Sequence, residues 1–265
     1  MTDHLASLPV PIAVGSGLDL SVLGCDGTYA GAGGACSGYL LCTVDDRIWL
    51  DAGPGTLARV QRHVPLAGLS AVVVTHEHPD HCGELPVLHN ALKYLLGLSG
   101  LRVITTEGTR DLVDHVCGGA WPTFDWDVVH GGEERQIGDL RLRFVTTDHP
   151  VETLAVRVDH PTGSLAYSSD TGAALDGRRL DPDGTGVDVM VVEASLSAQQ
   201  EGKVQHLSAA QAAHLAIEAG ARRVVVTHVV PGSEPAERRA EVEAVLTAGG
   251  ALVPTLTAAD HQTSG

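Results

Sequence analysis

Three histidines and two acidic residues fill five of the six positions 76–81, just after the apolar run 71–74. These residues are His76, Glu77, His78, Asp80 and His81. Imidazole and carboxylate groups are ordinary ligands of zinc and similar divalent ions. In an extended segment His76 and His78 point the same way, because side chains alternate with period two, and Asp80 and His81 lie on the turn beyond. The run therefore predicts half of a two-metal site, whose other half must come from elsewhere in the chain.

Four further apolar segments end in a residue that could belong to such a site. They are segment 48–50, which leads to Asp51, segment 142–147, which leads to His149, segment 165–169, which leads to Asp170, and segment 224–227, which leads to His228. A single histidine at a strand end is more often a surface or capping residue than a ligand. These four positions are candidates because each shares its setting with the run at 76–81.

Length and composition limit the kind of protein that carries these residues. The chain has 265 residues and 43% hydrophobic residues, enough for one large domain with a packed core. The formal net charge is −16, and the chain has only two lysines, Lys93 and Lys203. Binding of extended nucleic acid needs several Lys or Arg contacts to phosphates. We therefore expect no extended nucleic acid as partner, whereas a small anionic substrate drawn in by metal ions fits.

The cysteines and the hydropathy pattern favour a reduced, cytoplasmic protein. Five cysteines form an odd set, and none stands in a CxxC pair. Residues 1–17 lack the basic start and apolar run of a signal peptide, and no stretch approaches the ~20 apolar residues of a membrane span. We expect a cytoplasmic protein with no membrane partner.

The elements that must position the candidate residues alternate between strands and helices. Apolar strand patterns occur in both halves of the chain, with helices expected at 53–63, 85–96, 207–219 and 235–247. This order predicts two sheets inside and helices outside, a four-layered αββα sandwich of the α/β class. We expect a single domain over 18–256, a flexible N-terminal extension at 1–17 and a frayed tail at 257–265. The loop Gly27–Gly38 is either a connector or a backbone cradle for an anion.

The order of the motifs resembles that of the metallo-β-lactamase superfamily, over about residues 18–254. The motifs are HEHPDH at 76–81, the strand-end His149, SSDTG at 168–172 and VVVTH at 224–228. The resemblance implies the αββα fold and two divalent metal ions. It implies one ion held by His76, His78 and His149, a second held by Asp80, His81 and His228, and Asp170 bridging both. Asp51 matches the residue that orients the histidine loop from behind the ligands. Zn²⁺ is the expected ion, with Mn²⁺ and Fe²⁺ as alternatives.

A second stretch resembles one branch of this superfamily. Segments 193–196 and 204–209, the latter containing His206, are similar to those of ribonuclease Z and the related cyclic-nucleotide phosphodiesterases. The resemblance implies that His206 lies over the metal pair and protonates a leaving alkoxide, so Asp80 and His206 are the candidate catalytic residues. The alternative is that His206 is an exposed residue before a helix.

The interval between the third and fourth motifs favours a small substrate. Ribonuclease Z carries a long basic arm there, whereas the interval from 149 to 170 has room only for a strand pair. We predict a metal-dependent hydrolase, with a small phosphodiester such as a cyclic nucleotide as substrate. An acyl hydrolase (thioesterase, lactonase or β-lactamase-like) of a biosynthetic pathway and a ribonuclease Z-like endonuclease without the arm remain alternatives. A homodimer is compatible with the resemblance.

Overall fold

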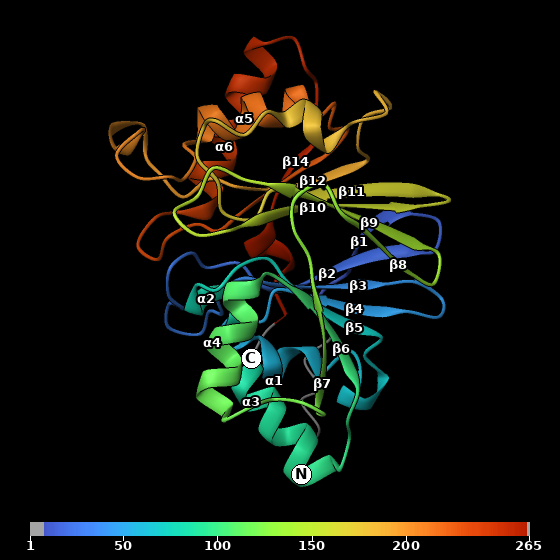
Figure 1. The fold of residues 1–265 in the computed structure, drawn as a ribbon. Coiled ribbons are helices and arrows are strands. Elements are labelled where there is room, and N and C mark those ends of the chain that lie inside the picture. Colours follow the sequence, from blue (N-terminus) through green and yellow to red (C-terminus); the bar gives the residue numbers. More distant parts are fainter. Residues whose placement is uncertain (1–7, 264–265) are drawn as a thin grey trace, which may run out of the picture.

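Two seven-stranded sheets lie face to face in the computed structural model, which describes residues 8–263 (Figure 1). In the first sheet the strands lie side by side in sequence order. They are β1 (Ile12–Gly15), β2 (Leu18–Gly24), β3 (Gly38–Cys42), β4 (Arg47–Leu50), β5 (Ala71–Val74), β6 (Leu101–Thr105) and β7 (Phe124–Val128). Neighbours are antiparallel from β1 to β4 and parallel from β4 to β7.

The second sheet has the same division into an antiparallel and a parallel half. Its spatial order runs β8 (Glu134–Ile137), β9 (Leu140–Thr146), β10 (Leu154–His160), β11 (Gly163–Tyr167), β12 (Val189–Glu193), β13 (Val224–Thr227) and β14 (Thr255–Thr257). Neighbours are antiparallel from β8 to β11 and parallel from β11 to β14. Ligands of α/β sheets bind at the carboxyl ends of such parallel strands.

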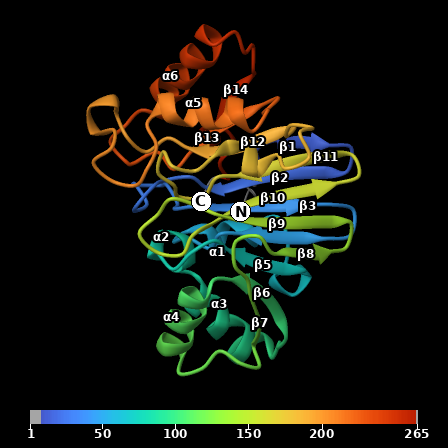
Figure 2. The same ribbon diagram turned by 45° about the horizontal axis from the view of Figure 1, so that its top comes forward.

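Helices cover the outer face of each sheet (Figures 1 and 2). The first sheet is covered by α1 (Thr56–Val60), α3 (Leu85–Asn90) and α4 (Glu107–Cys117), and the second by α5 (Ala209–Glu218) and α6 (Pro235–Ala248). The short helices are α2 (Pro79–Cys82), η1 (Leu66–Gly68), η2 (Ala91–Leu96), η3 (Gly177–Leu180), η4 (Ala198–Gln200) and η5 (Ala258–His261). The predicted four-layered αββα sandwich is confirmed.

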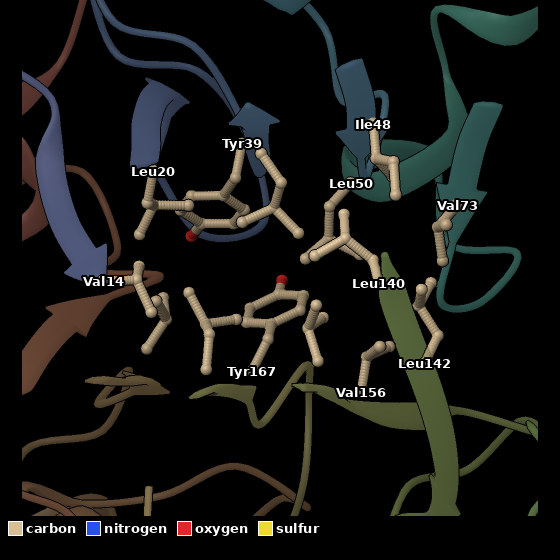
Figure 3. Packing of buried hydrophobic residues seen from close by; sticks show 14 of the residues in the cluster. Val14, Leu20, Tyr39, Ile48, Leu50, Val73, Leu140, Leu142, Val156 and Tyr167 are labelled. Atoms are coloured by element: carbon tan, nitrogen blue, oxygen red, sulfur yellow. The ribbon is translucent and has the colours of Figure 1, made fainter. Parts of the chain in front are cut away.

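Side-chain alternation explains why the central strands are apolar throughout. In β5, Ala71 and Val73 pack into the cluster between the sheets, whereas Val72 and Val74 pack under the helices. A strand covered on both faces reads as an uninterrupted apolar run. Between the sheets, Tyr39 and Tyr167 lie close together from opposite sides, with ring centroids 5.1 Å apart (Figure 3).

The chain ends differ from the sequence prediction. The flexible extension expected at 1–17 is wrong for residues 12–15, which form β1 and pair with β2 through the register Ile12↔Leu20. Ile12 and Val14 are buried in the core between the sheets, and this burial offsets the cost of ordering the edge strand. Residues 1–7 of that extension lie outside the described residues.

The tail expected to fray from 257 is also ordered as far as it is described. β14 extends to Thr257, η5 follows it, and Ala258 is buried between the sheets. Thr263 donates a backbone hydrogen bond of 2.8 Å to the carbonyl of Val22. Residues 264–265 lie outside the described part of the chain, and the single-domain boundaries 18–256 stay a prediction. Among residues 8–263, no helix is both long enough and apolar enough to cross a membrane.

Candidate metal centre

A proline divides the histidine run into two pairs of candidate ligands. β5 ends at Val74, and the chain stays extended through His78, which has φ −65° and ψ 140°. Pro79 then occupies the first turn of α2, a position that suits its fixed φ and missing amide proton. His76 and His78 therefore lie on the extended segment, whereas Asp80 and His81 lie on the helical turn.

The first pair joins two residues of the second sheet. Each of His76, His78, His149 and Asp170 offers a ligand atom, and these atoms all lie within 4.8 Å of one another. His149 Nε2 is 3.1 Å from His78 Nδ1, and the buried His76 Nε2 has no hydrogen-bond partner. Burial lowers the pKa of His76 and of His149, so both rings are neutral and offer a lone pair. These residues fit a divalent ion.

The second pair meets His228 from the end of β13. Ligand atoms of Asp80, His81, Asp170 and His228 also lie within 4.8 Å of one another. His228 Nε2 is 3.2 Å from Asp80 Oδ2 and 3.3 Å from His81 Nε2. Burial opposes charge on both imidazoles, but the neighbouring carboxylates together outweigh it and raise the pKa of His81, through Asp170 and Asp51, and of His228, through Asp170 and Asp80. The group attracts positive charge, which a divalent cation would supply.

Asp170 lies between the two groups and divides its oxygens between them. Oδ1 is 3.2 Å from His81 Nε2 and 3.3 Å from His228 Nε2, whereas Oδ2 is 3.7 Å from His76 Nε2 and 3.9 Å from His149 Nε2. Burial raises the pKa of this carboxyl, but His228 and His81 outweigh that effect and hold it well below its usual range. An ionised carboxylate in this place has the geometry that a bridging ligand requires.

Asp51 supports the centre from behind. It is fully buried, and its Oδ2 accepts hydrogen bonds from His81 Nδ1 at 2.7 Å and from the Tyr167 hydroxyl at 2.9 Å. Its Oδ1 accepts the backbone N–H of Thr75 at 2.8 Å. The bond to His81 Nδ1 fixes the ring so that Nε2 faces Asp170, as expected of a carboxylate behind a metal-binding histidine.

The Gly27–Gly38 loop packs directly against the candidate ligands. The backbone N–H of Thr28 donates to Asp80 Oδ2 at 2.8 Å. A Cβ atom at Gly27 would lie 2.7 Å from His228 Nδ1, so only glycine allows this approach. One backbone N–H of the loop thus binds a side-chain carboxylate of the protein itself, whereas the choice between a connector and an anion cradle stays a prediction.

His206 lies over the second group and is held by Glu193. Its Nδ1 is 3.0 Å and 3.2 Å from the two oxygens of Glu193, and its ring stacks on His228 with centroids 5.5 Å apart. Burial lowers the pKa of His206, but the hydrogen bond and charge of Glu193 outweigh it and raise that pKa to about 9. His206 is thus not simply an exposed residue before a helix; at neutral pH it holds a proton beside the candidate centre.

Two residues of the site received no role in the sequence analysis. Glu193 is buried at the end of β12, where it also accepts the Thr171 N–H at 2.8 Å. The Ser195 hydroxyl donates to Glu193 at 2.5 Å and lies 2.9 Å from His228 Nδ1. The available signal was an acidic residue ending a wholly apolar strand, the same signal that marked Asp51. All the predicted site residues lie in one place.

Comparisons with known proteins agree with this arrangement. A family model described as "Beta-lactamase superfamily domain" matches residues 46–229. An uncharacterized protein of Mycobacterium tuberculosis is 31% identical over 225 residues, which cover 80% of this chain and 81% of that protein. Ribonuclease Z of Methanopyrus kandleri is 26% identical over 257 residues, covering 82% of this chain and 91% of that protein.

A solved structure resembles the whole arrangement of elements. The crystal structure of the metallo-beta-lactamase fold protein YhfI from Bacillus subtilis has a TM-score of 0.80 to this structure at 24% identity. The match covers 94% of this chain and 97% of YhfI. The same Bacillus subtilis protein bears the description "Probable metallo-hydrolase" and is 26% identical over 216 residues, 80% of this chain and 87% of YhfI.

Proposed function

Because this chain belongs to the metallo-β-lactamase superfamily and resembles its ribonuclease Z and phosphodiesterase branch, we propose that it is a two-metal phosphodiesterase of small phosphodiesters. Membership of this family shows that the protein is a metal-dependent hydrolase. A cyclic nucleotide is the first substrate to test. The observation that carries the proposal is the placement of His206, whose Nδ1 lies 3.0 Å from the buried carboxylate of Glu193 and whose ring stacks on His228.

The proposal assigns two divalent ions to the two groups of ligand atoms. His76, His78 and His149 would hold one ion, Asp80, His81 and His228 the other, and Asp170 would bridge them. Zn²⁺ is the ion we propose, with Mn²⁺ and Fe²⁺ for comparison, because this ligand set accepts all three. When bound, such a pair activates water and stabilises the charge that develops on phosphate oxygens.

His206 is the reason to prefer a phosphodiester over a thioester. An alkoxide leaving group is a strong base and needs a proton as it departs, which a positioned acid supplies. A thiolate is stable at a pH near its pKa of about 8.5 and needs no such acid. In this proposal His206 donates its proton to the leaving oxygen, while Glu193 keeps the ring oriented and charged.

The hairpin between His149 and Asp170 supports a small substrate. β10 and β11 pair directly through the register His160↔Gly163, so the interval forms a short strand pair instead of an extended arm. The net charge of −16 adds repulsion of long polyanions. Ribonuclease Z-like cleavage of RNA remains the second candidate, favoured by the identity to the Methanopyrus kandleri enzyme.

The test combines metal analysis with paired substrates. Metal-loaded protein is expected to hold about two ions per chain and to hydrolyse cyclic nucleotides and bis-(p-nitrophenyl) phosphate. His206→Ala is expected to lower kcat by about 10²–10⁴-fold on alkoxide leaving groups. The loss should be much smaller with p-nitrophenolate, which is a far weaker base. Turnover of thioesters, lactones or β-lactams without any phosphodiester turnover would overturn the proposal, and cleavage of precursor tRNA would favour the second candidate.

A further inference from the structure

A cavity of about 480 Å³ opens beside the candidate metal centre, on the side of His206. Asp148 and Gly172 contribute to its wall; Asp148 directly precedes the candidate ligand His149, and Gly172 lies two residues after the candidate ligand Asp170. The segment 202–206 forms another wall. His206 itself lines the cavity, so a leaving group that contacts this side chain lies on this side of the centre. The cavity is therefore placed to receive the part of the substrate that leaves.

Two charged residues that line the cavity, Asp148 and Lys203, differ in whether their side chains have hydrogen-bond partners. Both oxygens of Asp148 are occupied by hydrogen bonds, because Oδ1 accepts from Gln205 Nε2 at 2.9 Å and Oδ2 accepts from the Ala174 N–H at 3.2 Å. The ammonium group of Lys203 has no ion pair or hydrogen bond within residues 8–263. Its acidic chain neighbour Glu201 accepts instead from the Ser208 hydroxyl at 2.6 Å.

A lysine without an ion pair or hydrogen bond is unusual in this chain, which has only two lysines. Acidic residues outnumber Lys and Arg by 33 to 17, and the other lysine, Lys93, lies over the ring of Tyr94 at 5.2 Å. Long-range repulsion keeps anions away from such a surface. A cation in the wall of this cavity adds a local attraction for negative charge. The cavity volume also lies within the range of small-molecule sites, roughly 300–1,000 Å³.

We propose that this cavity is the leaving-group subsite and that it selects a phosphodiester whose leaving group carries a second phosphate, bound by Lys203. The inference rests on the proposed phosphodiesterase function. A dinucleotide with a terminal phosphate has this chemistry. In hydrolysis a water oxygen forms the new bond to phosphorus and the proton it loses goes to solvent. The ester P–O bond breaks, the leaving oxygen takes the proton of His206, and His206 regains a proton from solvent. The second phosphate stays on the leaving nucleoside, in contact with Lys203.

The experiment uses three substrates that share one internal phosphodiester. They are the dinucleoside monophosphate ApA, its 5′-phosphorylated form pApA and its 3′-phosphorylated form ApAp. One of the two phosphorylated forms carries the second phosphate on the leaving side, whichever ester bond breaks. Wild-type protein is expected to prefer that form over ApA in kcat/KM by about tenfold, the effect of one charge-assisted contact. The preference should shrink as salt rises, because the contact is open to solvent.

Matched lysine variants separate the subsite from the overall charge. Lys203→Gln is expected to bring the preference close to one, Lys203→Arg to retain most of it, and Lys93→Gln to keep it in full. Equal turnover of all three substrates by the wild type, or a preference that survives Lys203→Gln, would overturn the subsite. So would turnover of bis-(p-nitrophenyl) phosphate with none of the dinucleotides, and the phosphodiesterase proposal would then stand. Acyl turnover alone would instead overturn that proposal.

Discussion

The proton on His206 depends on one buried carboxylate. Below a pH of about 9 the ring is charged, and Glu193 is what outweighs the burial that opposes this charge. We expect kcat for alkoxide leaving groups to fall as the pH rises through the pKa of His206. Glu193→Gln keeps a hydrogen-bond partner but removes the charge, so it should move this fall to lower pH. The measurement is kcat against pH for both proteins.

The control for this prediction is an ester with a p-nitrophenolate leaving group, whose kcat should lack the alkaline fall. A metal ion beside His228 changes the field at His206 in both proteins alike, so the comparison between them carries the test. Alkaline falls at the same pH in wild type and Glu193→Gln would contradict the role of Glu193.

Asp51 makes a prediction of a different kind, because it touches no candidate ligand atom. It holds His81 by Nδ1, and loss of such a partner lowers metal affinity by about 10–100-fold. We expect this loss in Asp51→Asn, measured by competition with a chelator. Asp51→Ala also leaves buried donors of Thr75 and Tyr167 without acceptors, at about 1–3 kcal/mol each, so it should lower the free energy of unfolding more. Asp45→Asn, on an exposed turn, is the control and should change neither quantity.

At the scale of elements, the sequence predicts strands well where both of their faces are buried. The sequence predicts strands that end at Val74 and Thr227, and β5 and β13 end at these residues in the structure. Both faces of these strands are covered, so their sequences are apolar throughout. α4 was missed because it buries only Thr109 and Val113 and exposes its remaining positions in part or fully. β1, β7 and β8 are edge strands of the two sheets. Their burial is one-sided, which leaves a weak hydrophobic pattern in the sequence.

In the candidate site, the sequence identifies the candidate ligands but not the residues that support them. Candidate ligands stand out because few residue types bind metals and their motif order is distinctive. Glu193 and Gln205 act through hydrogen bonds to His206 and Asp148, at separations of 13 and 57 positions. No spacing rule connects residues so far apart, so their roles follow only from the folded chain.

The segment between η4 and α5 is tied to the His149 loop by Gln205. Its carbonyl accepts from His149 Nδ1 at 3.2 Å, and its side chain donates to Asp148. Gln205→Ala removes only the second bond, so we expect kcat to fall about 2–10-fold, the net effect of one hydrogen bond, with unchanged metal content. Gln61→Ala is the control. It also removes one hydrogen bond of a glutamine side chain, to the carbonyl of Leu57, and should leave kcat unchanged. Through its bond to Asp148, Gln205 is expected to position His206, the next residue in the chain, and a loss confined to metal content would contradict this role.

At the scale of the whole molecule, the candidate ligands come from both sheets. His76, His78, Asp80 and His81 follow a strand of the first sheet, whereas His149, Asp170 and His228 follow strands of the second. The apolar core between the sheets also joins them, but its contacts are non-directional. A metal centre at this edge would therefore link the two halves of the sandwich at one defined point.

This link predicts that metal binding stabilises the fold. An ion present at 100 times its Kd adds about 2.7 kcal/mol to the free energy of unfolding, which raises Tm by roughly 5–10 °C in a chain of this size. We expect a chelator to lower Tm by at least that amount and added Zn²⁺ to restore it. His149→Ala should lose part of the response because one group of ligands is incomplete, whereas His160→Ala, in the β10–β11 hairpin, should respond like the wild type. An unchanged Tm after metal analysis has verified removal would show that the two sheets are held together by their apolar core alone.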